Sequence, residues 1–184
     1  SIGIDVGLKE FAVTSSGEIF ENPKWLRKSQ NRLKKLQKDL SRKKKGGKNR
    51  NRARKRVSRL HEKISNQRKD FLHKLSTQLI RENQSLVIED LRVKNLMKNS
   101  RLAQAIAEVS WAEFRRMLEY KAEWYGRNLI IAPSNYASSQ LCSECGYKNV
   151  NTKKLSVRNW ICPVCGSQHD RDINAARNLL KLVG

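Results

Sequence analysis

Short apolar runs open the chain and return after residue 84, and such runs are typical of β-strands. The first three runs are separated by turn signals, so they predict a tight meander. The two later runs are compact and rich in β-branched residues, which indicates buried strands, and Pro133 ends the second of them. We therefore expect five strands, at residues 2–8, 10–15, 18–21, 85–91 and 128–133.

A helical period replaces the strand pattern from about Trp25 onward. Leucines at spacings of seven, three and four form one apolar stripe, and a similar stripe runs from Val57 to Leu79 after a break. The break, residues 42–52, contains glycines and cations but no apolar residue. We interpret residues 24–82 as an antiparallel helical hairpin with a basic tip.

The second half of the chain predicts two more helices. Residues 103–126 carry an apolar face that ends near Gly126, and the polar stretch 92–102 before them is a candidate loop or lid over a site. The last helix follows Asp170, which is a natural N-cap.

The order of these elements predicts the fold. Three meandering strands, a helical excursion, a fourth strand, a helix, a fifth strand and a final helix form an α/β protein with the ribonuclease H-like arrangement. In this arrangement the first strand lies centrally beside the fourth, and the last helix packs against both. We expect the domain to comprise residues 1–137 and 169–184, with a small module inserted at 138–168.

The formal net charge of +22 favours a polyanionic partner, because so large a positive charge otherwise destabilises the compact state. Residues 24–69 hold 21 of the 39 Lys and Arg residues, against only Asp39 and Glu62. A solvated face does not explain so one-sided a balance, so we predict sequence-independent contacts to nucleic-acid phosphates. The predicted contacts are the cations at and beside the hairpin tip: Lys43, Lys44, Lys45, Lys48, Arg50, Arg52 and Arg54.

The hydrophobic pattern of the sequence contains neither a membrane-spanning run nor a secretory signal. No run of about 18 apolar residues predicts a membrane span, and no secretory signal opens the chain. The sequence lacks an initial Met and is already in a predicted strand at residue 2. We expect the chain to be the C-terminal part of a longer protein.

Four cysteines form two C-x-x-C pairs, each followed by a glycine that permits the left-handed turn of a metal knuckle. In a basic chain without a secretory signal, this pattern favours a metal over disulfides or a redox pair. His169 is interpreted as a residue beside the ligands or one that contacts substrate. A closed tetrahedral site for structural Zn²⁺, and with it a zinc ribbon at residues 138–168, is predicted from Cys142, Cys145, Cys162 and Cys165.

Acids lie within the first buried strand, near the end of the fourth strand and at the start of the last helix. Burying Asp5 costs several kcal/mol unless a cation compensates it, and Glu89 ends the fourth strand in the same way, although each acid alone also fits an ordinary cap. The last helix offers Asp170 or Asp172, and the spacing before residues 174–176 favours Asp172. Because the strand order brings three carboxylates together, we expect two Mg²⁺ ions to neutralise them and phosphodiester hydrolysis to be the reaction.

Four motifs then carry a resemblance that covers essentially the whole chain. They read G-I-D-V-G at residues 3–7, V-I-E-D-L at 87–91, S-Q-L-C-S-E-C-G at 139–146 and D-R-D-I-N-A-A at 170–176. Together they resemble the C-terminal half of the transposon-encoded TnpB proteins, which are RNA-guided DNA nucleases related to the type V CRISPR effectors.

The resemblance implies a split nuclease domain of the RuvC type, with Asp5, Glu89 and Asp172 as the catalytic, magnesium-binding acids. It also implies a ribbon that helps to load target DNA, a guide RNA derived from the transposon end, and cleavage beside a short flanking motif. A transposase of the same element is a further expected partner, and the expected setting is the nucleoid in the cytoplasm of a bacterium or archaeon. The N-terminal recognition domains of such proteins lie outside this sequence.

Two other interpretations stay open from the residues. A DDE transposase shares the fold, but its second acid is Asp and its last is Glu, the reverse of Glu89 and Asp172. A non-catalytic RNA- or DNA-binding regulator would be expected to have lost an acid, whereas this chain has all three.

Overall fold

The computed structural model describes residues 1–91, 93–154 and 156–183, which fall into two compact units. Ser1–Asn22 and Leu75–Gly184 make up the first unit, and Pro23–Lys74 make up the second. Among the described residues, no helix is both long enough and apolar enough to cross a membrane.

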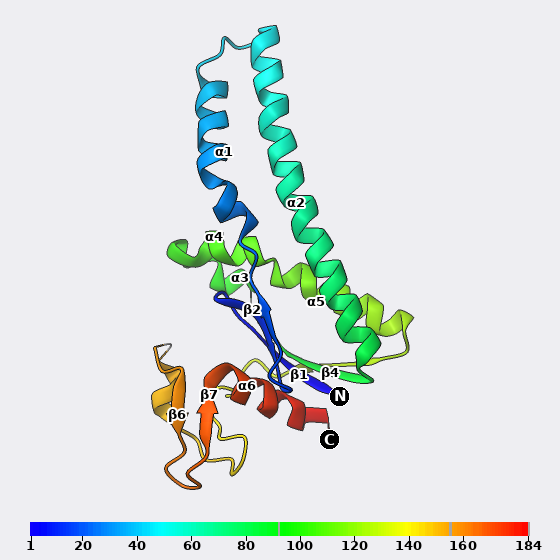
Figure 1. Cartoon of the computed structure of the whole chain (residues 1–184), viewed down its shortest axis with the longest axis vertical. Coiled ribbons are helices and arrows are strands. Elements are labelled where there is room, and N and C mark those ends of the chain that lie inside the picture. The colour runs from blue at the N-terminus through cyan, green and yellow to red at the C-terminus, as the bar shows by residue number, and fades with distance from the viewer. Residues whose placement is uncertain (92, 155, 184) are drawn as a thin grey trace. The chain divides into compact units, whose positions relative to one another are not determined.

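The first unit is built on a mixed five-stranded sheet in the order β3-β2-β1-β4-β5. The first three strands are antiparallel neighbours, whereas β1 pairs with β4, and β4 with β5, in parallel (Figure 1). This is the ribonuclease H-like order predicted from the sequence, with the first strand central beside the fourth, so the predicted fold class is confirmed. The strands are β1 (Ile2–Val6), β2 (Glu10–Thr14), β3 (Ile19–Glu21), β4 (Ser85–Glu89) and β5 (Asn128–Ala132).

The last helix, α6 (Arg171–Leu180), packs directly on β1. A Cβ atom at Gly3 would lie 2.0 Å from the carbonyl oxygen of Ala176 and 2.6 Å from the amide nitrogen of Leu180. Only glycine therefore allows helix and strand to approach this closely. A one-turn helix, η2 (Lys181–Val183), follows α6.

Helix α5 (Trp111–Trp124) lies on the opposite side of the sheet from α6 (Figure 1). The ring of Phe114 meets the ring of Phe11 edge-on, with the ring centroids 5.1 Å apart. Lys121 is buried on α5, and its ammonium group donates to the hydroxyl groups of Ser76 and Thr77 at 2.7 Å each. These hydrogen bonds offset part of the cost of burying a charged side chain.

Helices stand where the sequence predicted a loop over residues 92–102. Helix α3 (Val93–Leu96) and the start of α4 (Ser100–Val109) occupy most of this stretch, and Arg92 lies outside the described residues. The prediction of an irregular loop was wrong: Val93, Leu96 and Met97 lie at helical spacing, but a four-residue helix is too short for that period to stand out among polar residues.

The predicted helix 103–126 is interrupted. Its backbone breaks at Ser110, which has a left-handed φ of 55° and separates α4 from α5. The Ser110 hydroxyl donates to the carbonyl oxygen of Ala107 at 3.0 Å, a local bond that competes with helix continuation. Since neither glycine nor proline marks the position, the apolar period appears continuous in the sequence.

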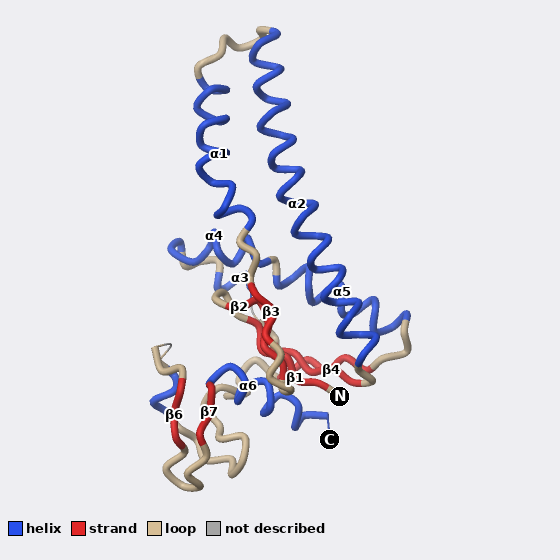
Figure 2. Tube along the Cα trace, viewed as in Figure 1, coloured by secondary structure: helices blue, strands red, loops and turns tan. Residues whose placement is uncertain are grey.

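The second unit is the predicted helical hairpin, formed by α1 (Trp25–Ser41) and the first part of α2 (Lys48–Glu82) (Figure 2). Within the hairpin, the ring of Trp25 packs edge-on against the ring of Phe71, with the ring centroids 5.7 Å apart. The tip is shorter than predicted, because α2 already begins at Lys48. The seam between the helices is apolar and consists of Leu33, Leu60 and Ile64, with Trp25, Leu26, Leu36 and Val57 packed against them.

The inserted module forms a small two-stranded sheet, in which β6 (Asn159–Ile161) pairs antiparallel with β7 (Gln168–Asp170). A single 3-10 turn, η1 (Val150–Lys153), precedes β6. Strand β7 runs into the cap of α6, two residues past the boundary expected at residue 168.

Candidate active site and metal centre

Strand register explains how two of the acids come together. Gly3 faces α6, and side chains alternate along a strand, so Asp5 lies on the same face of the sheet. On β4, Val87 is the register partner of Gly3 and packs against Leu179 of α6, which places Glu89 on that face as well. Both acids therefore sit at the carboxyl ends of neighbouring parallel strands, beneath α6.

The third acid, Asp172, lies in the first turn of α6 and completes the group. A cavity of about 380 Å³ is lined by Asp5, Glu89 and Asp172 together with Arg158 and Arg171. The structure thus brings together the three acids that the sequence analysis singled out.

Electrostatics in this cavity disfavour negative charge. Burial raises the pKa of Asp5 well above its usual range, and the charges of Glu89 and Asp172 raise it further, against the opposing effect of Arg171 and Arg158. Burial also raises the pKa of Glu89, while a hydrogen bond from Ser138 and the charge of Arg171 lower it. Three carboxylates held in this way need a compensating cation to ionise together.

We expect Asp5→Asn to raise the melting temperature by a few degrees at neutral pH without divalent cations. The folded chain retains a proton on Asp5 at pH values where the unfolded chain has released it, because folding raises this pKa. Stability therefore falls as the pH rises from the ordinary aspartate pKa of 3.8 towards the raised pKa, and Asn removes that penalty.

Calorimetry of both proteins over about pH 4 to 8 measures this difference, which should shrink toward the acid end. If the three acids bind Mg²⁺, added Mg²⁺ should reverse the order, because only the wild type keeps all three carboxylates. A lower melting temperature for Asp5→Asn without divalent cations would mean that Arg171 and Arg158 already compensate the carboxylate.

The two acids at the start of α6 have different partners. The Oδ1 atom of Asp170 accepts from the backbone amides of Asp172 and Ile173 at 3.0 Å each, which is an ordinary N-cap. Asp172 instead lines the cavity and accepts two hydrogen bonds from Nη1 of Arg158, at 2.8 and 3.0 Å. This arrangement favours Asp172 as the third acid of the site.

Sequence reasoning did not assign Arg158 or Arg171 to the acid site. Arg158 precedes β6 in the inserted module and appears in the sequence only as one basic residue of the ribbon. Arg171 stands between two acids, and its burial on α6 is the consequence of packing that no local pattern reveals. Arg171 lies within the motif at residues 170–176, but that motif was read only for its acids, and no motif marks Arg158.

The acid set fits a hard divalent cation by its donor chemistry, since carboxylate oxygens are the ligands that Mg²⁺ prefers. Burial and, after it, repulsion from Glu89 and Asp172 raise the pKa of Asp5, and a bound cation would offset both effects. Within the described residues the carboxylates do not reach a common spacing of 4.8 Å, and Asp172 is engaged with Arg158.

The four cysteines of the inserted module do reach that spacing, with all four sulfur atoms within 4.8 Å of one another. The Sγ atoms of Cys142 and Cys165 are 3.6 Å apart and those of Cys145 and Cys162 are 3.5 Å apart, so no disulfide is formed. Four thiolates around one point match a tetrahedral zinc ion and leave no open coordination position.

His169 lies beside this sulfur cluster. Its Nε2 atom is 3.1 Å from Sγ of Cys142, and its ring packs 4.6 Å from the ring of Trp160. Of the two roles considered from the sequence, the position fits a neighbour of the ligands that orients a thiolate. Burial lowers the pKa of His169, which favours the neutral ring.

At the hairpin tip the predicted basic residues do not all have the same surroundings. Nη1 of Arg50 donates to the carbonyl oxygens of Leu40 and Lys43, at 3.0 and 3.1 Å, and so caps the end of α1. Lys43 is ion-paired with Asp39 at 3.1 Å. The remaining predicted contacts are exposed, namely Lys44, Lys45, Lys48, Arg52 and Arg54.

The sheet order, the converging acids and the four-cysteine module define a ribonuclease H-like protein with an inserted zinc-ribbon module. The chain belongs to the OrfB_IS605 family, described as probable transposase, whose model matches residues 1–100. A second model, described as Cas12f1-like, TNB domain, matches residues 111–179. The chain is thus related to the TnpB proteins and to type V effectors of the Cas12f kind.

Curated relatives agree with this placement. A protein of Streptomyces pristinaespiralis named "Putative RNA-guided DNA endonuclease" is 52% identical over 181 residues, covering 98% of this chain and 44% of the relative. A protein of Escherichia coli K12 with the same name and the symbol InsQ is 36% identical over 194 residues, covering 97% and 48%. The chain therefore spans about half the length of these relatives.

The fold also matches solved structures. In the cryo-EM structure of a Cas12f1-sgRNA-target DNA complex, 48% of the protein chain superposes on 97% of this one, with a TM-score of 0.68 and 21% sequence identity. A CRISPR-Cas12f ternary complex gives a TM-score of 0.67 at 24% identity. At such identities the likeness establishes the fold.

Proposed function

We propose that this chain is the nuclease part of an RNA-guided DNA endonuclease of the TnpB kind, and that it hydrolyses phosphodiesters at the acid cavity. The observation that carries the proposal is the convergence of Asp5, Glu89 and Asp172 on one cavity, where burial and then the charges of the other two acids raise the pKa of Asp5. The names of the curated relatives support the same reaction.

In the proposed mechanism Asp5, Glu89 and Asp172, which line one cavity, would hold two Mg²⁺ ions. When bound, such ions supply an activated water and stabilise the leaving oxygen. Arg171 and Arg158 bring positive charge to the same cavity and would attract the phosphate of the substrate. Nη1 of Arg158, which donates to the carboxylate of Asp172 in this structure, is close enough to the proposed site to donate to such a phosphate if Asp172 turned to a metal ion.

The nuclease domain is proposed to comprise residues 1–137 and 169–184, with the zinc ribbon at 138–168. Target DNA and a guide RNA are the proposed partners, supported by the names of the relatives and of the Cas12f complexes. A transposase of the same element and a location at the nucleoid stay predictions from the resemblance.

The hairpin is proposed to bind the phosphates of the nucleic acid through its exposed tip. We expect the triple change Lys44→Gln, Lys48→Gln and Arg52→Gln to weaken binding of single-stranded DNA and RNA. The logarithmic salt slope should fall by about 0.7 for each phosphate that the variant no longer neutralises. Fluorescence anisotropy at several salt concentrations measures both quantities.

A matched control removes three cations from other exposed positions, through Lys74→Gln, Arg81→Gln and Lys98→Gln. Lys74 is ion-paired with Asp70. The net charge of the two triple variants is the same, so equal losses of binding would mean that total charge, and not the tip, binds the nucleic acid.

The proposed reaction is tested by Mg²⁺-dependent cleavage of labelled single-stranded and duplex DNA. Wild type and Glu89→Ala are compared, with DNA binding followed on the same samples. Cleavage that disappears in the variant while binding persists supports a metal-dependent nuclease at this cavity. Cleavage that persists in Glu89→Ala would contradict the proposal that the acid cavity is the catalytic site.

Binding without cleavage by the wild type requires a second step. The assay is then repeated with the full-length protein and its guide RNA. Cleavage restored in this way supports the proposal for the whole protein, whereas binding alone would establish a non-catalytic nucleic-acid-binding protein.

A further inference from the structure

Residues 138–143 join the acid cavity to the first cysteine knuckle, and we refer to them as the knuckle segment. At one end the hydroxyl group of Ser138 donates to the carboxylate of Glu89. At the other end lies Cys142, which is buried among the four cysteines. A shift of this segment would therefore move both the Glu89 contact at the acid cavity and the Cys142 sulfur at the cysteine cluster.

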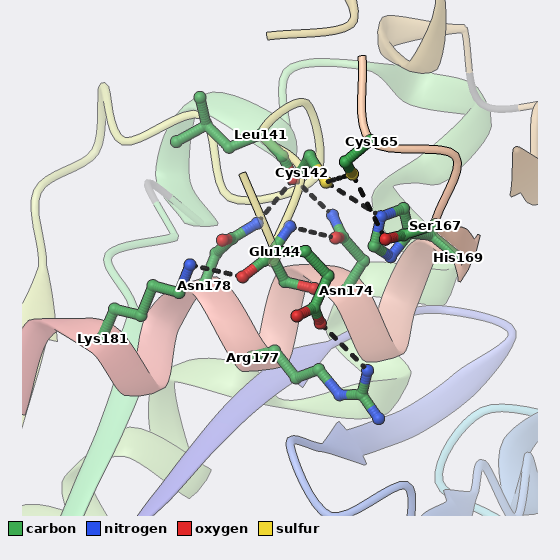
Figure 3. A network of polar contacts seen from close by, with 11 residues as sticks. Leu141, Cys142, Glu144, Cys165, Ser167, His169, Asn174, Arg177, Asn178 and Lys181 are labelled. Atoms are coloured by element: carbon green, nitrogen blue, oxygen red, sulfur yellow. Dashed lines mark hydrogen bonds and ion pairs between the residues drawn. The ribbon is translucent and has the colours of Figure 1, made fainter. Parts of the chain in front are cut away.

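Two buried asparagines of α6 hold the knuckle segment (Figure 3). Asn174 accepts from the amide of Ser143 at 2.9 Å and donates to the carbonyl oxygen of Leu141 at 2.7 Å. Asn178 donates to the carbonyl oxygens of Ser138 and Leu141, at 2.9 and 2.7 Å. The two side chains lie four residues apart, so they project from one face of the helix.

Replacing the asparagines of this face by apolar side chains would leave buried carbonyl groups of the segment without hydrogen-bond donors. Some backbone groups of the segment pair locally, such as the amides of Leu141 and Cys142 with the carbonyl oxygens of Ala137 and Tyr147. The carbonyl oxygens of Ser138, Leu141 and Ser143 instead accept from side chains at the last helix and its end. Asn174 and Asn178 are only 1% and 2% exposed, and an unpaired carbonyl beside them would have no access to water. Lys181 adds a third contact from the same face, donating to the carbonyl oxygen of Ser143 at 2.5 Å.

The same helix also carries Asp172 and packs on β1 without space for a Cβ at Gly3. Two acids are thus positioned relative to α6, Asp172 directly and Glu89 through Ser138 and Asn178. The first knuckle is positioned relative to that helix by the same asparagines.

We infer that Asn174 and Asn178 are positioning residues that couple the four-cysteine site to the acid cavity. The inference rests on the proposed function for the role of the acids. The zinc site holds the knuckle segment in place at Cys142. Asn174 and Asn178 hold the same segment against α6, and Ser138, at its other end, donates to Glu89 and so fixes the position of that carboxylate. Loss of zinc is then expected to weaken divalent-ion binding at the acids although no cysteine touches them.

Four variants separate the steps of this coupling. Asn178→Ala removes both hydrogen bonds, and Asn178→Leu removes them with a side chain of the same branched shape that leaves no cavity, which guards against a simple packing loss. Ser138→Ala cuts only the contact to Glu89. Arg177→Ala is the matched control, because Arg177 neighbours Asn178 on α6 but is exposed and lies 3.9 Å from its partner, Glu144.

Three quantities are measured on each variant: zinc release to a chromogenic chelator, Mn²⁺ affinity by calorimetry, and hydrogen exchange of the amides of residues 138–143. Both Asn178 variants should release zinc about tenfold faster and bind Mn²⁺ about tenfold more weakly. Ser138→Ala should lose Mn²⁺ affinity and keep normal zinc release. Arg177→Ala should change neither.

A lower melting temperature in both Asn178 variants, with unchanged zinc release and Mn²⁺ affinity, would reduce the asparagines to packing residues and overturn the inference. A wild type that binds no Mn²⁺ would contradict the proposed function instead. In that case zinc removal should still accelerate exchange at residues 138–143 if the coupling holds, and unchanged exchange would overturn it.

Discussion

Asp172→Ala is expected to lower the rate of Mg²⁺-dependent cleavage by at least about 10³-fold, because it removes one of the ligands on which the proposed two-ion chemistry depends. Asp172 lines the cavity with Asp5 and Glu89, and its loss leaves Arg158 without its carboxylate partner. Single-turnover cleavage with excess protein measures the chemical step. Binding of the same DNA should persist, since the substitution raises the positive charge of the cavity.

The neighbouring acid supplies the control. Asp170→Ala removes the N-cap of α6 and should cost about 1 kcal/mol of stability while leaving cleavage within a small factor of wild type. Urea denaturation measures the stability change. The opposite pattern, in which Asp170→Ala abolishes cleavage and Asp172→Ala only destabilises the fold, would exchange the roles of the two residues.

Cys162→Ser is expected to release about one zinc ion per chain and to unfold the inserted module. The Cys162 thiol is buried, and its sulfur lies 3.5 Å from that of Cys145, so a serine leaves the tetrahedral site one ligand short. Zinc binding supplies a large part of the folding free energy of small metal modules, so the residual three ligands should not hold the fold.

Atomic emission measures the zinc content, and hydrogen exchange should show loss of protection in β6 and β7 with the five-stranded sheet retained. Ser156→Ala, at an exposed position of the same module, is the control and should keep its zinc. Unchanged zinc stoichiometry in Cys162→Ser would refute the four-cysteine site.

Some elements could be predicted from a short stretch of sequence alone, because a single local property determines them. The apolar runs that contain Asp5 and Glu89 predict β1 and β4 to within two residues, because a buried strand is recognisable from its own composition. Asp170 gave the start of α6 because an N-cap acts within three residues. The convergence of three acids followed from the strand order; their catalytic role stays a prediction.

Features that depend on distant partners could not be predicted. Nothing near Ser110 marks the left-handed break between α4 and α5. Asn174 and Asn178 appear in the sequence as polar positions on a helix, and their carbonyl partners lie 33 to 40 residues earlier in the chain. Arg158 gains its place at the acid cavity from the fold of the inserted module.

The basic tip illustrates a further limit of composition. Counting cations groups Arg50 with its neighbours, yet its guanidinium is engaged by two carbonyl oxygens at the end of α1. A charge run therefore predicts a binding surface without separating the cations that shape it from those that face the solvent.

The most direct test of the central claim is a crystal structure of the protein with Mn²⁺ in place of Mg²⁺, with anomalous scattering used to locate the ions. The proposed chemistry predicts two manganese peaks about 4 Å apart among Asp5, Glu89 and Asp172, with the Asp172 carboxylate released from Arg158. The absence of any peak at the three acids, at Mn²⁺ concentrations that support cleavage, would contradict the claim that they form a metal-dependent nuclease site.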